Sequence, residues 1–194
     1  TIYPFGGLIK TNKLINFSPI KELLISLGGI LNQLILYILF FYLYKYSFIN
    51  TYSYNLFLSI NTSLILFNII PIYPLDGYII LNSLLNLIIP YLKSNIISLI
   101  ISIITLIIFI LYSYNNKINS IFVISFLLYK LYNYLKEYKY IHNKFILERS
   151  MYDIPFNKII YLNTFNPYFL KLNKYYYFNY KSEKEVINSI YKYY

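Results

Sequence analysis

The sequence has no cysteine and no tryptophan, and it is poor in charge, glycine and methionine. Only 12% of its 194 residues are charged, half the share of about 25% that is usual in soluble domains. Without cysteine, the chain can form neither a disulfide framework nor a cysteine-ligated zinc site. Its 58% hydrophobic content is too high for a disordered chain. The composition therefore favours a membrane protein.

Uncharged stretches divide the chain into segments that are long enough to cross a bilayer. The two longest are residues 23–44, with 22 residues, and residues 46–75, with 30 residues. A bilayer core of about 30 Å takes about 20 apolar residues in a helix. We therefore expect an all-α polytopic membrane protein with about four transmembrane helices, near residues 23–44, 54–75 (continuing in broken form to about 92), 96–114 and 118–136.

The distribution of lysine and arginine predicts the orientation of these helices. We assign residues 1–21, the region of Lys93 and the chain after about residue 130 to one side of the membrane. That side then holds 15 of the 17 cationic residues, and the opposite side holds only Lys45 and Lys117. The positive-inside rule places the richer side, with the C-terminus, in the cytoplasm. We expect a multi-pass protein of the cell membrane. Attraction to anionic lipid accounts for the net charge of +10, so we expect the lipid bilayer and no nucleic acid as a partner.

All five glycines fall in three places, which are Gly6-Gly7, Gly28-Gly29 and Gly77. The second place is followed closely by Asn32 and Gln33, early in the first span. Small residues let a neighbouring helix approach closely, and amides inside a membrane form hydrogen bonds between helices. These four residues predict a packing face, and Asn32 or Gln33 could also contact whatever occupies the space beside it.

The third place combines an interrupted helix with an acidic residue. A helix that starts at residue 54 would have only about 15 residues, some 22 Å, before Asn68. Pro71 and Pro74 each remove a backbone donor and disfavour helix for the residue before them, and Gly77 allows a turn. We therefore expect unwound backbone inside the bilayer around Asp76, which has no other charged residue within 15 positions. A charge there is a functional candidate, although the same residues equally suit a type I turn at the membrane interface.

These residues resemble a known family. The pattern Asn68-x-x-Pro71-x-x-Pro74-Leu75-Asp76-Gly77 is similar to the Asn/Pro-rich Leu-Asp-Gly motif of site-2 proteases, the intramembrane zinc metalloproteases. Three other stretches resemble the sporulation branch of that family in order and spacing, namely residues 3–7, 28–29 and 140–149. The resemblance covers about residues 1–150.

The resemblance implies a zinc endopeptidase that cleaves a membrane-tethered protein, such as a sporulation sigma-factor precursor. Asp76 would be the third zinc ligand, beside two histidines of a His-Glu-x-x-His helix whose glutamate serves as general base. An open fourth position on the metal would hold the water. The other residues implied to line a wet substrate cavity are Asn32, Asn68, Pro71, Pro74 and Gly77.

The His-Glu-x-x-His motif itself is missing from this sequence. The single histidine, His142, lies 66 positions after Asp76, and we expect it to be solvated or to cap a helix. The motif would normally precede residues 4–7 by about one loop, so we expect a segment that carries it to precede residue 1. The chain as given cannot hold a catalytic zinc ion with one carboxylate.

Two other functions stay open at this point, together with the organisation of the C-terminal part. One is a catalytically inactive relative that serves as a binding or scaffold protein, and the other is a small ion-coupled transporter in which Asp76 binds a cation or a proton.

We expect a membrane-embedded core at residues 1–138 and a small cytoplasmic α+β tail at 139–194, a reduced regulatory domain. Its predicted elements are strands near residues 159–161 and 175–180 and a helix at 182–191, with Ser182 as N-cap.

Overall fold

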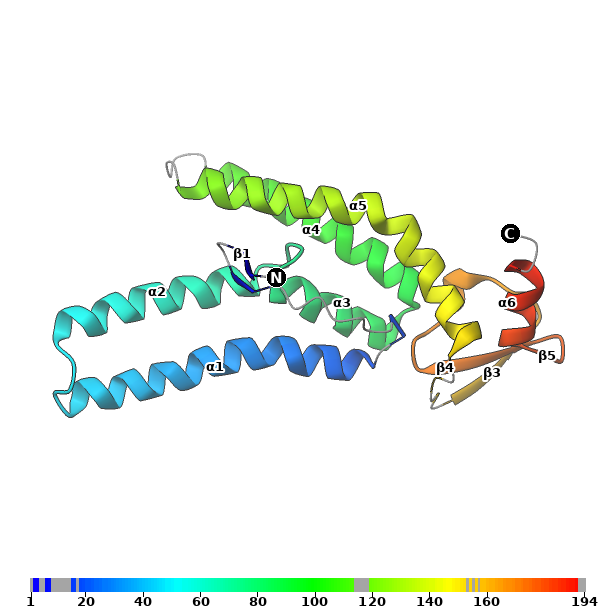
Figure 1. Cartoon of the computed structure of the whole chain (residues 1–194), viewed down its shortest axis with the longest axis horizontal. Helices are drawn as coiled ribbons and strands as arrows, with labels where there is room; N and C mark the ends of the chain where they lie inside the picture. The colour runs from blue at the N-terminus through cyan, green and yellow to red at the C-terminus, as the bar shows by residue number, and fades with distance from the viewer. Residues whose placement is uncertain are drawn as a thin grey trace.

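The computed structural model describes residues 2–3, 6–7, 15–16, 18–113, 119–152, 154, 156 and 158–191. Most of them are helical (Figure 1). The helices are α1 (Pro19–Lys45), α2 (Thr51–Ile69), α3 (Asp76–Ile88), α4 (Tyr91–Ser113), α5 (Asn119–Met151) and α6 (Glu183–Tyr191), with a short 3-10 helix η1 (Pro167–Phe169). The strands are β1 (Ile2–Tyr3), β2 (Gly6–Gly7), β3 (Lys158–Leu162), β4 (Lys174–Phe178) and β5 (Lys181–Ser182).

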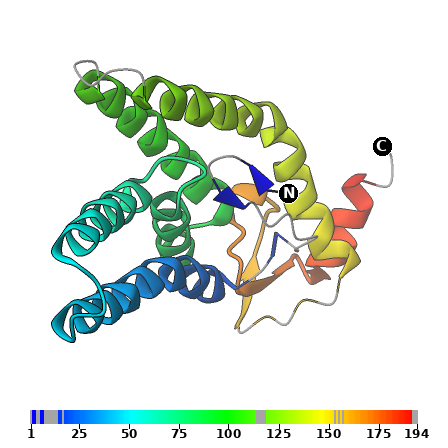
Figure 2. The same cartoon turned by 60° about the vertical axis from the view of Figure 1, so that its left-hand side comes forward.

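Two helical hairpins enclose the short helix α3. Figures 1 and 2 show α1 beside α2 and α4 beside α5, with α3 between the two pairs. Aromatic rings join the first hairpin, since Phe40 stacks on Phe57 with ring centroids 3.5 Å apart and Tyr44 stacks on Tyr54 at 4.5 Å. The bundle thus places α3, and the interrupted segment before it, against helices from both hairpins.

The helices α1 and α4 are long and apolar enough to cross a membrane. The 27 residues of α1 reach about 40 Å at 1.5 Å per residue, more than a bilayer core. Many of its apolar side chains are exposed, and Leu24, Ile25 and Ile35 each expose at least 60% of their surface. An apolar surface of this extent is stable in lipid rather than in water. The structure therefore agrees with a membrane protein, and α2 and α5 as further spans stay a prediction.

The predicted interruption between the second and third helices is confirmed. Helix α2 ends at Ile69 and α3 begins at Asp76, so residues 70–75 belong to no helix. The peptide bond between Tyr73 and Pro74 within this segment is cis. Apolar side chains of the segment, Ile72 and Leu75, are buried in a cluster with Leu99 and residues of α5. The break is therefore packed inside the helical bundle.

The C-terminal part forms a small domain with mixed α and β structure, as predicted. β4 lies at the centre of a three-stranded sheet, parallel to β3 and antiparallel to β5. Helix α6 follows, with Ser182 as the predicted N-cap. The backbone N–H of Ser182 donates to the Glu185 carboxylate at 2.8 Å. This hydrogen bond and the side-chain hydrogen bond between Ser182 and the same carboxylate hold the pKa of Glu185 below its usual range.

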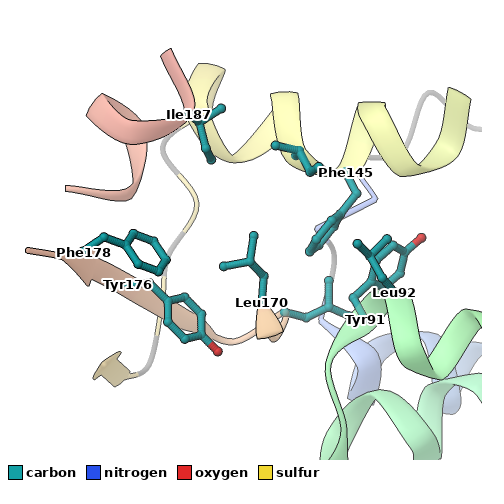
Figure 3. Packing of buried hydrophobic residues seen from close by; sticks show 9 residues of the cluster. Tyr91, Leu92, Phe145, Leu170, Tyr176, Phe178 and Ile187 are labelled. Atoms are coloured by element: carbon teal, nitrogen blue, oxygen red, sulfur yellow. The ribbon is translucent and has the colours of Figure 1, made fainter. Parts of the chain in front are cut away.

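The core of this domain includes residues from α4 and α5. Helix α5 continues past residue 138 to Met151, so the predicted domain boundary lies inside one helix. The start of α4 also contributes, and the backbone N–H of Tyr91 donates to the Leu170 carbonyl at 3.1 Å. The buried cluster that joins these parts is formed by Tyr91, Leu92, Phe145, Ile146, Leu170, Leu172, Tyr176, Phe178 and Ile187 (Figure 3).

Candidate functional site

Asp76 is the first residue of α3 and comes directly after the interrupted segment. Its side chain is half-buried. Among the residues that the structure describes, no hydrogen bond or ion pair joins this carboxylate to another group. A half-buried carboxylate without a protein partner is costly in an apolar bundle, which makes it the leading candidate for binding a cationic ligand.

Helix α1 brings Gly29 against Asp76. A Cβ atom on Gly29 would lie 3.1 Å from Asp76 Oδ2, whereas one on Gly28 would have no atom within 4 Å. Successive residues of a helix point about 100° apart, so only one of two adjacent glycines can face a given neighbour. The predicted packing face is therefore confirmed for Gly29, and Gly28 is not part of this contact.

Of the two amide residues on α1, Gln33 is the one in contact with a neighbouring helix. It lies one turn after Gly29, and its backbone carbonyl accepts a hydrogen bond of 3.1 Å from Asn61 of α2, which is buried. The Gln33 side-chain oxygen is buried and has no hydrogen-bond partner among the residues that the structure describes. Asn32 is exposed. A role for Asn32 in a substrate cavity stays a prediction.

Gly77 is buried where the end of α2 meets the start of α3. A Cβ atom on Gly77 would lie 2.1 Å from the carbonyl oxygen of Ile69 and 2.6 Å from that of Ile70. Both neighbours are backbone atoms, which cannot move aside as a side chain can. The glycine after Asp76 is therefore required by the close contact between the two helices.

This contact predicts that Gly77→Ala destabilises the fold by about 1–3 kcal/mol, as inserting a methyl group into a packed interior does. Gly28→Ala is the matched control, because it also adds one methyl group but has open space around it. It should be neutral or stabilising by up to about 1 kcal/mol, since alanine favours helix over glycine. Thermal unfolding of the two purified variants in the same detergent tests the difference, and equal midpoints would contradict it.

The remaining predicted site residues lie within the interrupted segment (Pro71 and Pro74) or just before it (Asn68). The carbonyl of Pro71 lies 3.2 Å from the Thr105 hydroxyl of α4, and Pro74 precedes Leu75 and Asp76. Asn68 is half-buried in the last turn of α2. Their proposed contact with a substrate stays a prediction.

A cluster of tyrosines beside Asp76 was not anticipated from the sequence. The rings of Tyr73 and Tyr134 lie 4.5 Å apart, and that of Tyr78 is 5.3 Å from Tyr73. The hydroxyl of Ser98 lies within 3.4 Å of that of Tyr78. The cluster connects α3, α4, α5 and the break, and the only sequence signal for it is the tyrosine on either side of Asp76.

A polar seam holds α3 against α4. Ser94, Ser98 and Ser102 lie one turn apart on α4 and are fully buried. The Ser94 hydroxyl lies 2.8 Å from the Asn82 side-chain oxygen and 2.7 Å from that of Asn86, both on α3. Hydrogen bonds of this kind join helices inside a membrane. The helix that begins with Asp76 is thus fixed along its length.

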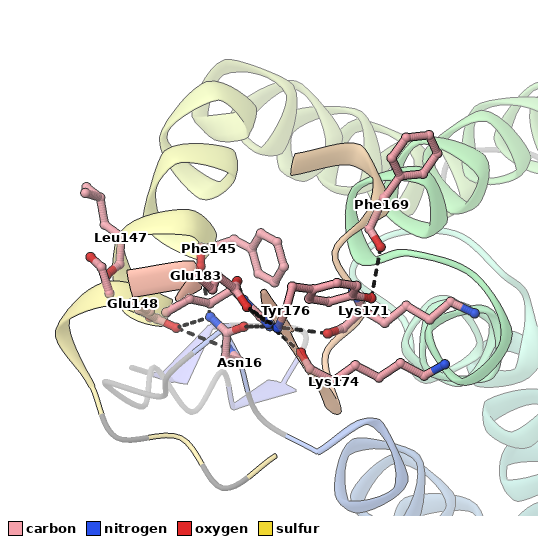
Figure 4. A network of polar contacts seen from close by, with 11 residues as sticks. Asn16, Phe145, Leu147, Glu148, Phe169, Lys171, Lys174, Tyr176 and Glu183 are labelled. Carbon is pink, nitrogen blue, oxygen red and sulfur yellow. Dashed lines mark hydrogen bonds and ion pairs between the residues drawn. The ribbon is translucent and has the colours of Figure 1, made fainter. Parts of the chain in front are cut away.

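A second polar cluster, far from Asp76 in the sequence, centres on Arg149 at the end of α5. Figure 4 shows the network, with Asn16, Lys174 and Glu183 among its labelled residues. Arg149 and Glu183 are both fully buried, and Arg149 Nη2 lies 2.9 Å from Glu183 Oε2. Arg149 Nη1 also donates to the Asn16 side chain at 3.2 Å. Sequence reasoning missed this cluster, although one signal was available. Arg149 is the single arginine among 17 cationic residues, and arginine suits buried bidentate ion pairs better than lysine.

The zinc ion that the motif resemblance implies is not accommodated by these residues alone. A zinc site takes at least three protein ligands, and the described part of the chain brings together no three His, Cys, Asp or Glu residues. His142 lies on α5 against Tyr168, with ring centroids 5.7 Å apart, and burial lowers its pKa. Asp76 is thus one potential ligand, and the described part of the chain places no second and third ligand beside it.

Comparison with known proteins finds a relative of low identity, and no family model matches the chain. Stage IV sporulation protein FB of Bacillus subtilis (strain 168) is 27% identical to the chain over 151 residues. The match covers 76% of this chain and 52% of that protein, so the chain spans about half the length of its curated relative. The sporulation name agrees with the branch whose motifs the sequence resembles.

Proposed function

We propose that this chain forms the aspartate-bearing membrane core of an intramembrane zinc endopeptidase of the site-2 protease type. Its substrate would be a membrane-tethered protein. The observation that carries the proposal is the Asp76 carboxylate, which is half-buried at an interrupted helix and has no partner among the described residues. The similarity to a sporulation protein supports the same family.

The chain's own residues would serve such an enzyme by holding one carboxylate in place. Gly77 lets α3 start directly against the end of α2, and Gly29 leaves room for the carboxylate beside α1. The half-buried setting limits the access of bulk water, which strengthens the attraction between a carboxylate and a cation. When bound, zinc would act as a Lewis acid toward a peptide carbonyl and its attacking water. Two histidine ligands and the general base would have to come from residues that this sequence does not contain.

The remaining parts of the proposal concern topology. We propose a multi-pass protein of the cell membrane with the C-terminal domain in the cytoplasm. The excess of lysine on that side supports this orientation, and Lys93 and Lys171 lie where the domain meets α3 and α4. The cytoplasmic domain would then be in contact with the ends of the helices that hold Asp76.

The test is the zinc content of the protein expressed from its complete coding region and purified in detergent. We expect about one zinc per chain by elemental analysis, as for a site with a full set of protein ligands. Cleavage of a reporter that carries a transmembrane segment should stop after treatment with a chelator and return when zinc is added. Preparations that contain no zinc would overturn the proposal. Sodium- or proton-driven flux in vesicles of such zinc-free protein would favour the transporter instead.

A further inference from the structure

The backbone of the interrupted segment satisfies its N–H groups in two different ways. Pro71 and Pro74 have no N–H group. Of the other four residues, three donate to carbonyls close by in the sequence. The N–H of Ile70 donates to Phe67, that of Ile72 to Ile70, and that of Leu75 to Ile72. The N–H of Tyr73 instead donates to the Ser102 hydroxyl of α4 at 2.9 Å. Tyr73 is thus the one residue of this segment whose N–H depends on another helix.

Ser102 is placed in an otherwise apolar contact. It is fully buried, and it lies between Leu99 and Leu106 on one face of α4. These two leucines belong to the same buried cluster as Ile72. Against this apolar surface, the Ser102 hydroxyl is the group that meets the Tyr73 N–H. A buried N–H group left without an acceptor typically costs about 1–3 kcal/mol, and inside a membrane water cannot replace the acceptor.

A second hydroxyl of α4, that of Thr105, also contacts the interrupted segment. The Thr105 hydroxyl is 3.2 Å from the Pro71 carbonyl, and also 2.9 Å from the Ile101 carbonyl and 3.1 Å from that of Ser102. Its single proton is therefore shared among three acceptors, two of them in its own helix. Thr105 supports the position of the break, but the Tyr73 N–H has Ser102 as its acceptor.

We infer that Ser102 is a positioning residue for Asp76. The chain from Tyr73 to Asp76 is short and internally bonded, since the Leu75 N–H donates to the Ile72 carbonyl at 2.8 Å before α3 begins. A displacement of Tyr73 from α4 therefore moves the start of α3. On its other side the Asp76 carboxylate lies close to Gly29 of α1, so a movement of the start of α3 also changes this contact. The inference rests on the proposed function in that Asp76 is taken as the functional group.

The test compares Ser102→Ala with Ser63→Ala as the matched control. Ser63 is exposed and donates to the Ser59 carbonyl of its own helix at 2.8 Å. We measure hydrogen–deuterium exchange on peptides that cover residues 68–78 of the full-length protein in lipid nanodiscs. Ser102→Ala should raise exchange at Tyr73 about tenfold or more, because the amide has lost its acceptor, while Ser63→Ala should leave it unchanged. In the same preparations, the turnover number for reporter cleavage should fall with little change in KM.

A second variant keeps the test decisive if Ser102→Ala does not fold. Ser102→Cys keeps a group with a lone pair at the same position, slightly larger than the hydroxyl and a weaker acceptor, so exchange at Tyr73 should rise to an intermediate value. Unchanged exchange at Tyr73 in every folded Ser102 variant would overturn the inference, as would faster exchange with wild-type turnover. Failure of the proposed function would look different from failure of this inference. A wild-type protein that binds no zinc and cleaves no reporter would overturn the proposed function, and the exchange rate at Tyr73 could still be measured in it.

Discussion

Asp76→Asn is expected to remove bound zinc and to reduce cleavage of a membrane-tethered reporter at least about 100-fold. The substitution keeps the shape of the side chain but replaces a carboxylate with a neutral amide, which is a much poorer zinc ligand. Loss of a group outside the ligand shell alone typically costs 10–100-fold, and loss of a ligand costs more. Elemental analysis and reporter cleavage, both on the protein from its complete coding region, give the two measurements.

The fold should survive this substitution, which makes the result interpretable. Asp76 has no partner among the described residues that the amide could lose. A graded companion is Gly29→Ala, whose methyl group would lie 3.1 Å from Asp76 Oδ2 and would press on the carboxylate. It should lower cleavage partially, while Gly28→Ala, with open space around it, should leave cleavage at the wild-type rate. Unchanged turnover in Asp76→Asn would refute the assignment of Asp76 as a ligand.

The helical core was predictable because its signals are local. Uncharged stretches gave the starts of the four long helices to within about five residues, although α5 continues 15 residues past the predicted end at residue 136. Pro71 and Pro74 gave the interruption, because proline acts on the backbone at its own position. Ser182 as the N-cap of α6 was predictable for the same reason, since the capping bonds involve residues three apart. Asp76 could be chosen as the candidate functional residue because no other charged residue lies near it in the sequence.

Contacts between distant segments were not predictable in this way. A sequence does not tell which of two adjacent glycines faces Asp76, because that depends on the rotation of α1 relative to α3. Nor does it tell that Ser102 supplies the acceptor for the break, since Ser94 and Ser98 lie at the same four-residue spacing on α4. The buried pair of Arg149 and Glu183, 34 positions apart, likewise appears only when the C-terminal domain is folded against α5.

Arg149→Met is expected to destabilise the C-terminal domain by about 3–5 kcal/mol, because breaking a buried ion pair leaves one charge buried without its counterion. Glu183 would keep the hydrogen bond from the Tyr176 N–H, at 3.1 Å, but no cationic partner. The substitution also removes the bonds of the guanidinium to Asn16 and to the Lys171 carbonyl, each 3.2 Å long. Urea unfolding of the full chain in detergent, followed by exchange protection of residues 174–187, measures the loss.

The matched control is Lys144→Met, which removes a partly exposed cation of α5 that pairs with Glu148 of the same helix. Lys144 Nζ lies 3.7 Å from Glu148 Oε1, and the lysine side chain is 37% exposed, whereas Glu148 is buried. Glu148 keeps the hydrogen bonds from the Asn16 backbone and side chain, so the loss of Lys144 should cost at most about 1 kcal/mol. A double variant, Arg149→Met with Glu183→Met, should be more stable than the sum of the two single effects predicts, since it leaves no buried charge. If Arg149→Met costs no more than Lys144→Met, the buried pair does not hold the domain to α5. Because Arg149 also binds Asn16, just before α1, its loss should loosen the start of the helix that carries Gly29.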